Sequence, residues 1–390
     1  MQTQRGDAEG KRRLIARLAA AIAAVLALVA IAGCGGGSDD ATTGGESGGS
    51  ATTAEAGGAL EAEGEEIADP QLWKEAQEQG SVTLYGAISG EREEAIDEAF
   101  TELTGIDVNL IQGTGSETYQ KVTNLQAAGK LDADIVRQTD GTLAESEAAK
   151  GVFAKYCSPF EKGLPKEAIG KPCYFVAPII DVYAFAYNSA LVKEDEAPKS
   201  WQDLLDPKWK GKIGVPYIGA GGSTWARDLF LRKEFGKEYW EKLAAQDPVL
   251  SDQVSTTTDQ LVQGEVEVAT DVPPTVAAAI KEGAPVAISM PTDGVPAYGA
   301  FTGVAADARH EAAAKVFLNW NLSKAGQKAV AEKAGDYPVR PGSPAPVVDG
   351  EERLPALDEL DVAFPETWPE YRSDRDAWTS EWLKLFNYSP

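Results

Sequence analysis

The sequence has few of the side chains that carry nucleophilic or metal chemistry. Its 390 residues include three cysteines, two methionines and one histidine, His310. A hydrolase of the triad type needs a histidine as its base, and a zinc-protease helix needs a second histidine four residues after the first, where this chain has alanine. We therefore expect a protein that is not an enzyme and has no cofactor. A secreted hydrolase that uses two carboxylates is kept as an alternative.

Basic residues are also far fewer than acidic residues. The chain has 36 Lys and Arg against 61 Asp and Glu, which gives a net charge of −25. A surface this acidic repels phosphate backbones, so nucleic acid is excluded as a partner. Beyond residue 33 no apolar run is long enough to cross a bilayer, and no transmembrane segment is expected there.

What is present begins with an export signal. Four basic residues between positions 11 and 17 precede the uncharged, mostly apolar stretch 18–33, which is the pattern of a secretory signal. The stretch ends in Ile31-Ala32-Gly33-Cys34, which resembles a lipobox, the site where a signal peptide is cut before a cysteine that receives lipid. Residues 1–33 are thus predicted to be a lipoprotein signal peptide and Cys34 the lipidated residue. The protein would be anchored outside the cytoplasm to the bacterial cell membrane, at the cell surface or in the periplasm; a retained anchor helix is the alternative.

Residues 34–72 are predicted to be the lipidated cysteine followed by a disordered acidic tether. From Gly35 to Leu72 there is no Lys, Arg or aromatic residue, and Gly, Ser, Thr, Ala and nine acidic residues predominate. Such a composition cannot bury a core. As a flexible coil of about 35 residues it would reach roughly 30 Å on average.

Cys157 and Cys173 remain as an isolated pair. In an exported protein two such cysteines are expected to form a disulfide, here one that closes a loop of about 16 residues. A metal or redox pair is disfavoured, because the Cys-x-x-Cys spacing and nearby histidines are both lacking.

Strand-like and helix-like segments alternate along the rest of the chain. The first series consists of strands at 81–88, 107–112 and 134–138 and helices at 90–104, 116–128 and 143–150. The second consists of strands at 212–218, 266–270 and 285–290 and helices at 223–235, 237–246 and 274–282. This alternation predicts an α/β protein whose sheets are mostly parallel and flanked by helices. Two series joined by an extended segment, 174–187, predict two lobes with a ligand cleft between them.

These patterns predict how the folded part is divided. Residues 73–182 are the first part of lobe 1, and residues 183–294 are lobe 2. Residues 295–342 return to lobe 1 and include late helices, and residues 343–390 are a Pro-rich tail with a C-terminal helix.

Several segments between residues 80 and 342 carry a family resemblance. They are Val82–Tyr85, Phe100–Val108, Ala133–Ile135, Ala186–Asn188, Pro198–Ile213, Ala313–Trp320 and Tyr337–Arg340. Together they resemble the extracellular solute-binding lipoproteins of bacterial ABC importers, in the ferric-iron-binding-protein-like group. The resemblance implies a type II periplasmic-binding fold with crossings near Val182–Tyr187 and Val295–Ala300. It also implies a monomer that binds a small molecule or an ion and delivers it to a membrane permease.

The ferric ligand set is not carried over with the family. Ferric members of the group typically end their second lobe with two adjacent tyrosines, whereas Asp293–Gly299 contains only Tyr298 and no adjacent tyrosine pair occurs in the chain. A phosphonate, a sugar phosphate or a related organic anion is therefore preferred as the solute. Ferric iron held by non-standard Asp and Tyr ligands is the alternative.

Ligands of open α/β sheets sit at loops after the carboxyl ends of strands. Among these loops Gly221–Thr224 is the most suggestive, because glycines permit close backbone approach and free N–H groups at a helix start attract oxyanions. Three carboxylates predicted near the cleft call for amine or hydroxyl donors, or a metal. Helix capping alone is the alternative for the hydroxyls. The candidate ligand-binding residues are Tyr85, Ser89, Thr114, Ser116, Asp140, Gly221, Gly222, Ser223, Thr224, Asp271, Asp293 and Tyr298.

Overall fold

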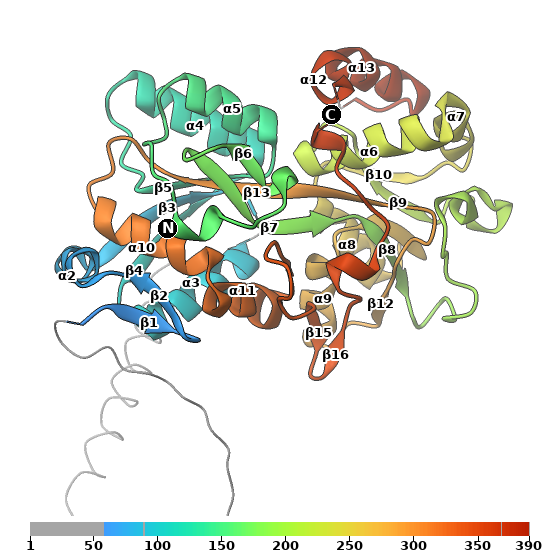
Figure 1. Ribbon diagram of the computed structural model, residues 1–390. Coiled ribbons are helices and arrows are strands. Elements are labelled where there is room, and N and C mark those ends of the chain that lie inside the picture. Colours follow the sequence, from blue (N-terminus) through green and yellow to red (C-terminus); the bar gives the residue numbers. More distant parts are fainter. Residues whose placement is uncertain (1–57, 89, 368, 390) are drawn as a thin grey trace, which may run out of the picture. The chain divides into compact units, whose positions relative to one another are not determined.

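A computed structural model describes residues 58–88, 90–367 and 369–389 (Figure 1). These residues belong to one compact unit with two main β-sheets, of eight and five strands. We call the eight-stranded sheet with its helices lobe 1 and the five-stranded sheet with its helices lobe 2. The predicted two-lobed α/β class is confirmed. The signal peptide, Cys34 and the first part of the tether lie outside the described residues.

The sheet of lobe 1 has the strand order β14-β7-β13-β5-β3-β4, with β6 paired to β7 and β17 to β13. Its strands are β3 (Ser81–Gly86), β4 (Asp107–Gln112), β5 (Ile135–Gln138), β6 (Ile169–Lys171), β7 (Phe175–Val182), β13 (Val295–Val304), β14 (Tyr337–Pro338) and β17 (Val362–Ala363). The sheet of lobe 2 has the order β10-β9-β11-β8-β12. Its strands are β8 (Ala184–Asn188), β9 (Ile213–Pro216), β10 (Val249–Ser251), β11 (Val268–Asp271) and β12 (Val286–Ser289).

Both sheets are mixed, which corrects the expectation of mostly parallel sheets. β3, β4 and β5 are parallel neighbours, as are β9, β10 and β11, and these strands alternate with helices as the sequence predicts. The strands that pass between the lobes pair antiparallel, β7 with β13 in lobe 1 and β8 with β11 and β12 in lobe 2. The prediction failed because these long strands return without a crossover helix.

The helices cover the faces of both sheets (Figure 1). They are α2 (Pro70–Gln79), α3 (Gly90–Thr104), α4 (Gly115–Ala127), α5 (Gly141–Ala149), α6 (Gly222–Phe235), α7 (Lys237–Ala244), α8 (Val254–Gln263), α9 (Pro273–Lys281), α10 (Glu311–Leu322), α11 (Lys324–Ala329), α12 (Glu370–Ser373) and α13 (Arg375–Leu385). Both α3 and β4 begin and end where the sequence predicts. Of the helices in the described ranges, none combines the length and apolar character needed to cross a membrane.

The predicted tether ends earlier than expected. Residues 60–62 and 65–68 form a hairpin of strands β1 (Leu60–Ala62) and β2 (Glu65–Ala68), and α2 follows directly. Leu60, Ile67 and Trp73 are buried in the core of lobe 1. The disorder prediction is thus wrong for residues 58–72, because a few apolar side chains at alternating positions suffice when a neighbouring lobe supplies the rest of the core.

The last part of the chain forms a C-terminal arm, which we define as residues 361–367 and 369–389. The arm begins on lobe 1, where β17 pairs with the start of β13. It ends on lobe 2, where Tyr371 and Trp382 are buried in that lobe's core. The predicted closing helix is confirmed as α13.

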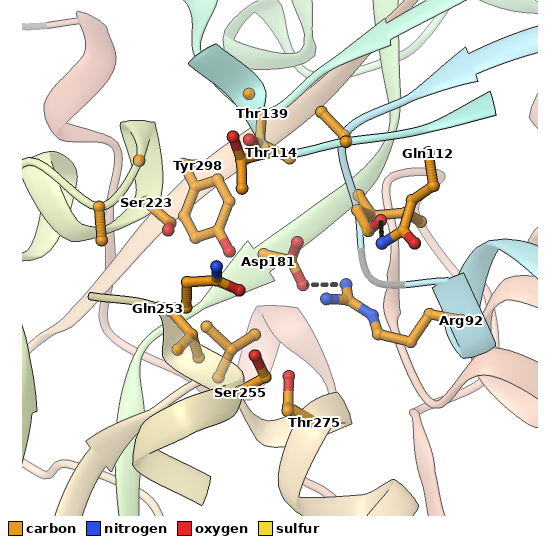
Figure 2. A pocket seen from close by; sticks show the side chains of 18 residues that line it. Arg92, Gln112, Thr114, Thr139, Asp181, Ser223, Gln253, Ser255, Thr275 and Tyr298 are labelled. Carbon is orange, nitrogen blue, oxygen red and sulfur yellow. Dashed lines mark hydrogen bonds and ion pairs between the residues drawn. The ribbon is translucent and has the colours of Figure 1, made fainter. Parts of the chain in front are cut away.

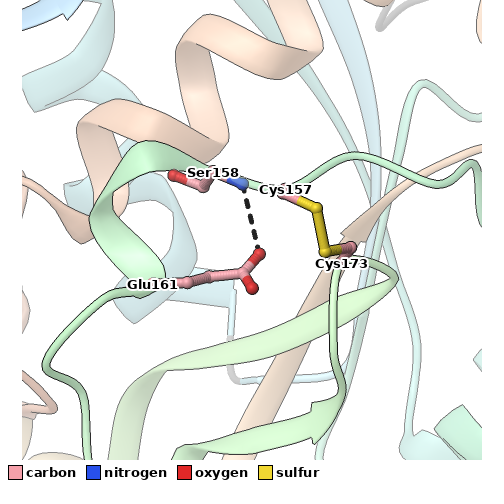
Figure 3. The surroundings of a disulfide bond; sticks show 4 residues. All are labelled: Cys157, Ser158, Glu161 and Cys173. Carbon is pink, nitrogen blue, oxygen red and sulfur yellow. Dashed lines mark hydrogen bonds between the residues drawn. A yellow bond between two sulfur atoms is a disulfide. The ribbon is translucent and has the colours of Figure 1, made fainter.

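Cys157 and Cys173 form the predicted disulfide (Figure 3). The bond fastens the loop after β-bridge residue Phe153 to the turn that leads into β7. Next to it, Ser158 donates its N–H to Glu161 Oε1 over 3.2 Å. The disulfide therefore closes a loop that contains little regular structure of its own.

Replacing both cysteines by serine should lower the free energy of unfolding by about 3 kcal/mol, because the open loop has more conformational freedom in the unfolded chain. Urea unfolding with and without a reductant measures this. The reductant should destabilise the wild type and leave the double variant unchanged. Equal stability of the wild type under both conditions would show that the thiols are reduced.

Candidate functional site

A cavity of about 180 Å³ lies between the two lobes (Figure 2). It is bordered by the segments that follow the carboxyl ends of β3, β4 and β5 in lobe 1 and of β9, β10 and β11 in lobe 2, where ligands of α/β sheets are expected. Its lining residues are Ala87, Ile88, Arg92, Gln112, Gly113, Thr114, Gly115, Thr139, Asp181, Ala220, Gly221, Ser223, Gln253, Val254, Ser255, Val272, Thr275 and Tyr298.

Four helices begin at this cavity. The first residues of α4 and α8 belong to the lining, and α6 and α9 contribute the residue just before the helix and one in its first turn. The amino end of a helix carries free N–H groups and a partial positive charge. In α4 the side chain of Thr114 caps one of these groups, whereas α6 and α8 have no side-chain cap at all. Helix α9 starts with two prolines, so its contribution is the dipole and the hydroxyl of Thr275.

Arg92 of α3 is the basic residue among the described lining residues, and two carboxylates hold it in place. Its Nη2 donates to Asp181 Oδ1 over 2.5 Å, and its Nε donates to Asp336 Oδ2 over 3.1 Å. All three side chains are buried. Burial and the neighbouring Asp181 raise the pKa of Asp336, while Arg92 opposes the shift. The cluster has two carboxylates for one guanidinium, so one acceptor is left over.

That acceptor is Asp181 Oδ2, which has no hydrogen-bond partner among the described residues. Figure 2 shows the carboxylate near the centre of the cavity, between Arg92 and Tyr298. A buried carboxylate oxygen without a donor costs free energy. A ligand that brings an N–H or O–H group to this point would remove that cost.

Tyr298 of β13 lies opposite Asp181 of β7, and Tyr183, between β7 and β8, lies near Tyr298. The ring centroids of Tyr298 and Tyr183 are 6.5 Å apart, and both are buried. Burial and the charge of Asp181 raise the pKa of Tyr298 well above its usual value. At neutral pH Tyr298 is therefore a neutral phenol, which can donate a hydrogen bond to a ligand oxygen.

Four of the predicted residues line the cavity: Thr114, Gly221, Ser223 and Tyr298. Ser89 lies outside the described residues, between Ile88 of the lining and helix α3. Ser116 and Gly222 are not in the lining, although each directly follows a residue that is. The structure thus brings together the hydroxyl and glycine candidates, from both lobes.

Five predicted residues lie away from the lining, because their polar atoms serve the protein itself. The Tyr85 hydroxyl donates to Asp132 Oδ1 over 2.5 Å. The Thr224 hydroxyl donates to Ile218 O and accepts from Gly221 N at the start of α6.

The three remaining carboxylates in this group are engaged in the same way. Asp140 caps α5, where its Oδ1 accepts from the Thr142 N–H. Asp271 accepts from Thr258 Oγ1 over 2.8 Å, and burial raises its pKa to about 7. Asp293 accepts from Trp201 N over 3.0 Å. These three predicted carboxylates lie away from the cavity, whereas Asp181, which was not predicted, is among its lining residues.

Sequence reasoning missed the lobe 2 residues Gln253, Ser255 and Thr275 and the lobe 1 residues Arg92, Gln112, Thr139 and Asp181. Helix α8 was overlooked because Ser255 to Thr258 are polar and poor helix formers. Asp181 had one available signal: it is a charged residue within the otherwise apolar strand β7, which indicates a buried partner. Arg92 had none, because it stands among the acidic residues at the start of α3.

Comparisons with known proteins identify relatives of this chain and solved structures with the same fold. A relative in Salmonella typhimurium, named "Putative 2-aminoethylphosphonate-binding periplasmic protein", is 28% identical over 254 residues, 62% of this chain and 72% of the relative. The crystal structure of iron-bound HitA from Pseudomonas aeruginosa has a TM-score of 0.61 at 23% identity, covering 79% of this chain and 98% of that one. The structure of AfuA from Actinobacillus pleuropneumoniae with fructose-6-phosphate bound has a TM-score of 0.65 at 19% identity, covering 80% and 99%.

Residues 95–356 match the family described as bacterial extracellular solute-binding protein. Two thirds of the chain fall in this range. The two-lobed fold is shared with the solved structures. The chain belongs to the bacterial extracellular solute-binding protein family.

Proposed function

We propose that this protein is the solute-binding component of an ABC importer and captures a small organic oxyanion, a phosphonate or phosphate ester, between its lobes. The observation that carries the proposal is the meeting of four helix amino ends with the hydroxyls of Thr114, Thr139, Ser223 and Ser255 around one cavity. Uncapped N–H groups and hydroxyls are the donors that tetrahedral oxyanions require. No bond need be broken for this task.

Within that class the site favours a ligand with a second, donating group. The oxyanion is served by the helix ends, while Asp181 Oδ2 offers a buried acceptor a short way across the same cavity. A ligand with an ammonium group and a phosphonate group satisfies both. The Salmonella relatives named for 2-aminoethylphosphonate support this choice.

Ferric iron is the weaker alternative. Fold neighbours bind iron, but in the described part of the chain the acidic candidates Asp140, Asp271 and Asp293 are engaged elsewhere, and no group of three His, Cys, Asp or Glu side chains is arranged to hold a metal. Among the lining residues, Tyr298 and Asp181 are the hard oxygen groups left for a metal, and one oxygen of Asp181 is already paired with Arg92.

The ligand class is tested by calorimetric titration with 2-aminoethylphosphonate, ethylphosphonate and ferric citrate. We expect 2-aminoethylphosphonate to bind at least tenfold more tightly than ethylphosphonate, which corresponds to about 1.4 kcal/mol. Asp181→Asn should remove this preference and leave ethylphosphonate binding nearly unchanged, because only the ammonium group needs the carboxylate.

The three ligands test separate parts of the proposal: the role of Asp181, the oxyanion site and the iron alternative. Equal affinity for both phosphonates would refute the donor role of Asp181 and leave the oxyanion site standing. Tight binding of ferric citrate alone would favour the iron alternative. A thermal unfolding curve of Asp181→Asn shows whether loss of the ion pair to Arg92 has disturbed the fold.

Gly222 is expected to matter for closure of the lobes. A Cβ at this position would lie 2.5 Å from the carbonyl oxygen of Thr139 and 2.6 Å from Asp140 Cβ, both in the other lobe. Gly222→Val should therefore keep the lobes apart and weaken ligand binding at least tenfold, with little effect on the unfolding of either lobe.

Gly221→Ala is the matched control. Gly221 has extended backbone geometry, and its Cβ would meet only Ser223 Oγ, at 3.8 Å. The control should let the two lobes approach as in the wild type, which small-angle scattering measures. Wild-type affinity in Gly222→Val would show that the lobes need not approach this closely.

The protein is further proposed to act as a lipid-anchored monomer that delivers its solute to a membrane permease. The motif at Cys34 supports the anchor, and membership of the solute-binding family supports the permease as partner. Cys34→Ala should move the protein from the membrane fraction to the soluble fraction, because the lipid can no longer be attached. If the variant stays with the membrane, residues 18–33 are a retained anchor helix.

A further inference from the structure

The C-terminal arm follows the part of the chain that matches the solute-binding family, which ends at residue 356. It is fastened firmly to lobe 2. Tyr371 and Trp382 are buried in the core of that lobe, and the Nε1–H of Trp225 in α6 donates to Tyr371 O over 2.8 Å. Lys237 of α7 pairs with Glu381 of α13 over 2.7 Å. Helices α12 and α13 are thus a rigid part of lobe 2.

From this base the arm reaches lobe 1 through two arginines. Arg375, the first residue of α13, pairs with Asp140 at the start of α5. Arg372 of α12 pairs with Glu145 one turn further along α5, with Nε to Oε2 at 3.1 Å. Asp140 is fully buried and Arg375 is 28% exposed, whereas Arg372 and Glu145 are both about half exposed. The first pair is therefore the stronger contact between the lobes.

The Arg375–Asp140 pair lies beside the closest approach of the two lobes. Gly222, at the start of α6, packs against Thr139 and Asp140 of lobe 1. The hydroxyl of Tyr371 in the arm donates to the carbonyl oxygen of the same Gly222 over 3.3 Å. Thr139 also lines the ligand cavity. Separation of the lobes at the cavity must consequently break the pair of Arg375 and Asp140.

We propose that the C-terminal arm acts as a latch, which means that it stabilises the closed arrangement of the lobes. The interaction responsible is the ion pair between Arg375 and Asp140. The pair exists only when α5 and α6 are together, so its free energy counts for the closed state and not for the open one. It adds to the closing effect of any bound solute. The latch is independent of what the solute is.

The Asp140 side chain allows the pair to break without loss of the fold. Its Oδ1 caps α5 by accepting from Thr142 N and Oγ1, and its Oδ2 takes Arg375. When the lobes part, the cap remains and Oδ2 meets water. Arg375, which is 28% exposed while the pair is formed, becomes solvated in the same step. The latch can therefore open reversibly, and added salt should weaken it.

A double-mutant cycle on the full chain without ligand tests the latch. Arg375→Gln removes the cation, and Asp140→Asn removes the charge while it keeps an oxygen to cap α5. Hydrogen exchange of the backbone amides in 139–144 and 221–226 reports opening at this contact. Each single variant should raise these exchange rates roughly tenfold, between the effects of an exposed and a fully buried ion pair.

The combined variant should exchange no faster than either single one, because both changes remove the same interaction. Salt at about 0.5 M should raise the exchange of the wild type and not that of Arg375→Gln. Lys237→Gln is the matched control, since it removes an ion pair of the arm that lies wholly within lobe 2. It should leave exchange in both segments unchanged.

Three results would overturn the latch. One is wild-type exchange in Arg375→Gln. Another is strict additivity of the two changes, which would mean that Arg375 and Asp140 act separately. The last is equal acceleration in Lys237→Gln, which would mean that loosening of the arm on lobe 2, and no contact between the lobes, causes the effect. Thermal unfolding of each variant identifies any loss of fold.

Discussion

The antiparallel pairing of β7 with β13 is the constraint on which the site depends. Both strands are buried along their whole length, and β7 leads within two residues into β8 of the other sheet. The register sets Asp181 opposite Tyr298 and Val182 opposite Ala297. Because successive side chains of a strand point to opposite faces, a shift of the register by one residue would put Asp181 and Tyr298 on opposite faces of the sheet. Strands β7 and β13, which join the lobes, thus also position Asp181 and Tyr298 at the centre of the site.

The electrostatics of the cavity follow from what surrounds this pair. Four helix amino ends present positive potential, and the buried cluster of Arg92, Asp181 and Asp336 presents an excess of carboxylate. These two features have opposite sign and lie on the same cavity. A solute with one anionic and one donating end matches both, whereas a bare anion leaves Asp181 Oδ2 without a partner. Selectivity among solutes therefore depends on whether the solute donates a hydrogen bond to Asp181 Oδ2.

Much of the fold could be predicted because many of its helices and strands show a clear periodic pattern of apolar residues. In α3 the apolar residues Ile96 and Phe100 recur at helical spacing and are buried, and Phe100 packs on Phe317 of α10. Strand β4 follows after a glycine turn. Where the pattern is weak, prediction failed. Helix α8 was not predicted because it contains four hydroxyl residues in a row. The hairpin β1–β2 was not predicted because its apolar residues are few and separated. Such segments are fixed by tertiary contacts that a local pattern does not contain.

The candidate site was predicted in its location and only partly in its residues, for a physical reason that Gly222 and Asp140 make plain. A glycine at a helix start indicates that something approaches the backbone closely, and a carboxylate after a strand indicates that donors lie near it. Both statements hold in this structure. What approaches Gly222, however, is the opposite lobe, and what meets Asp140 is the amino end of α5 and Arg375 of the C-terminal arm. In a two-lobed protein the same chemistry serves to hold ligand and to hold the lobes together, since both compete for the loops at the carboxyl ends of the strands. Only the three-dimensional arrangement assigns each loop residue to one task or the other.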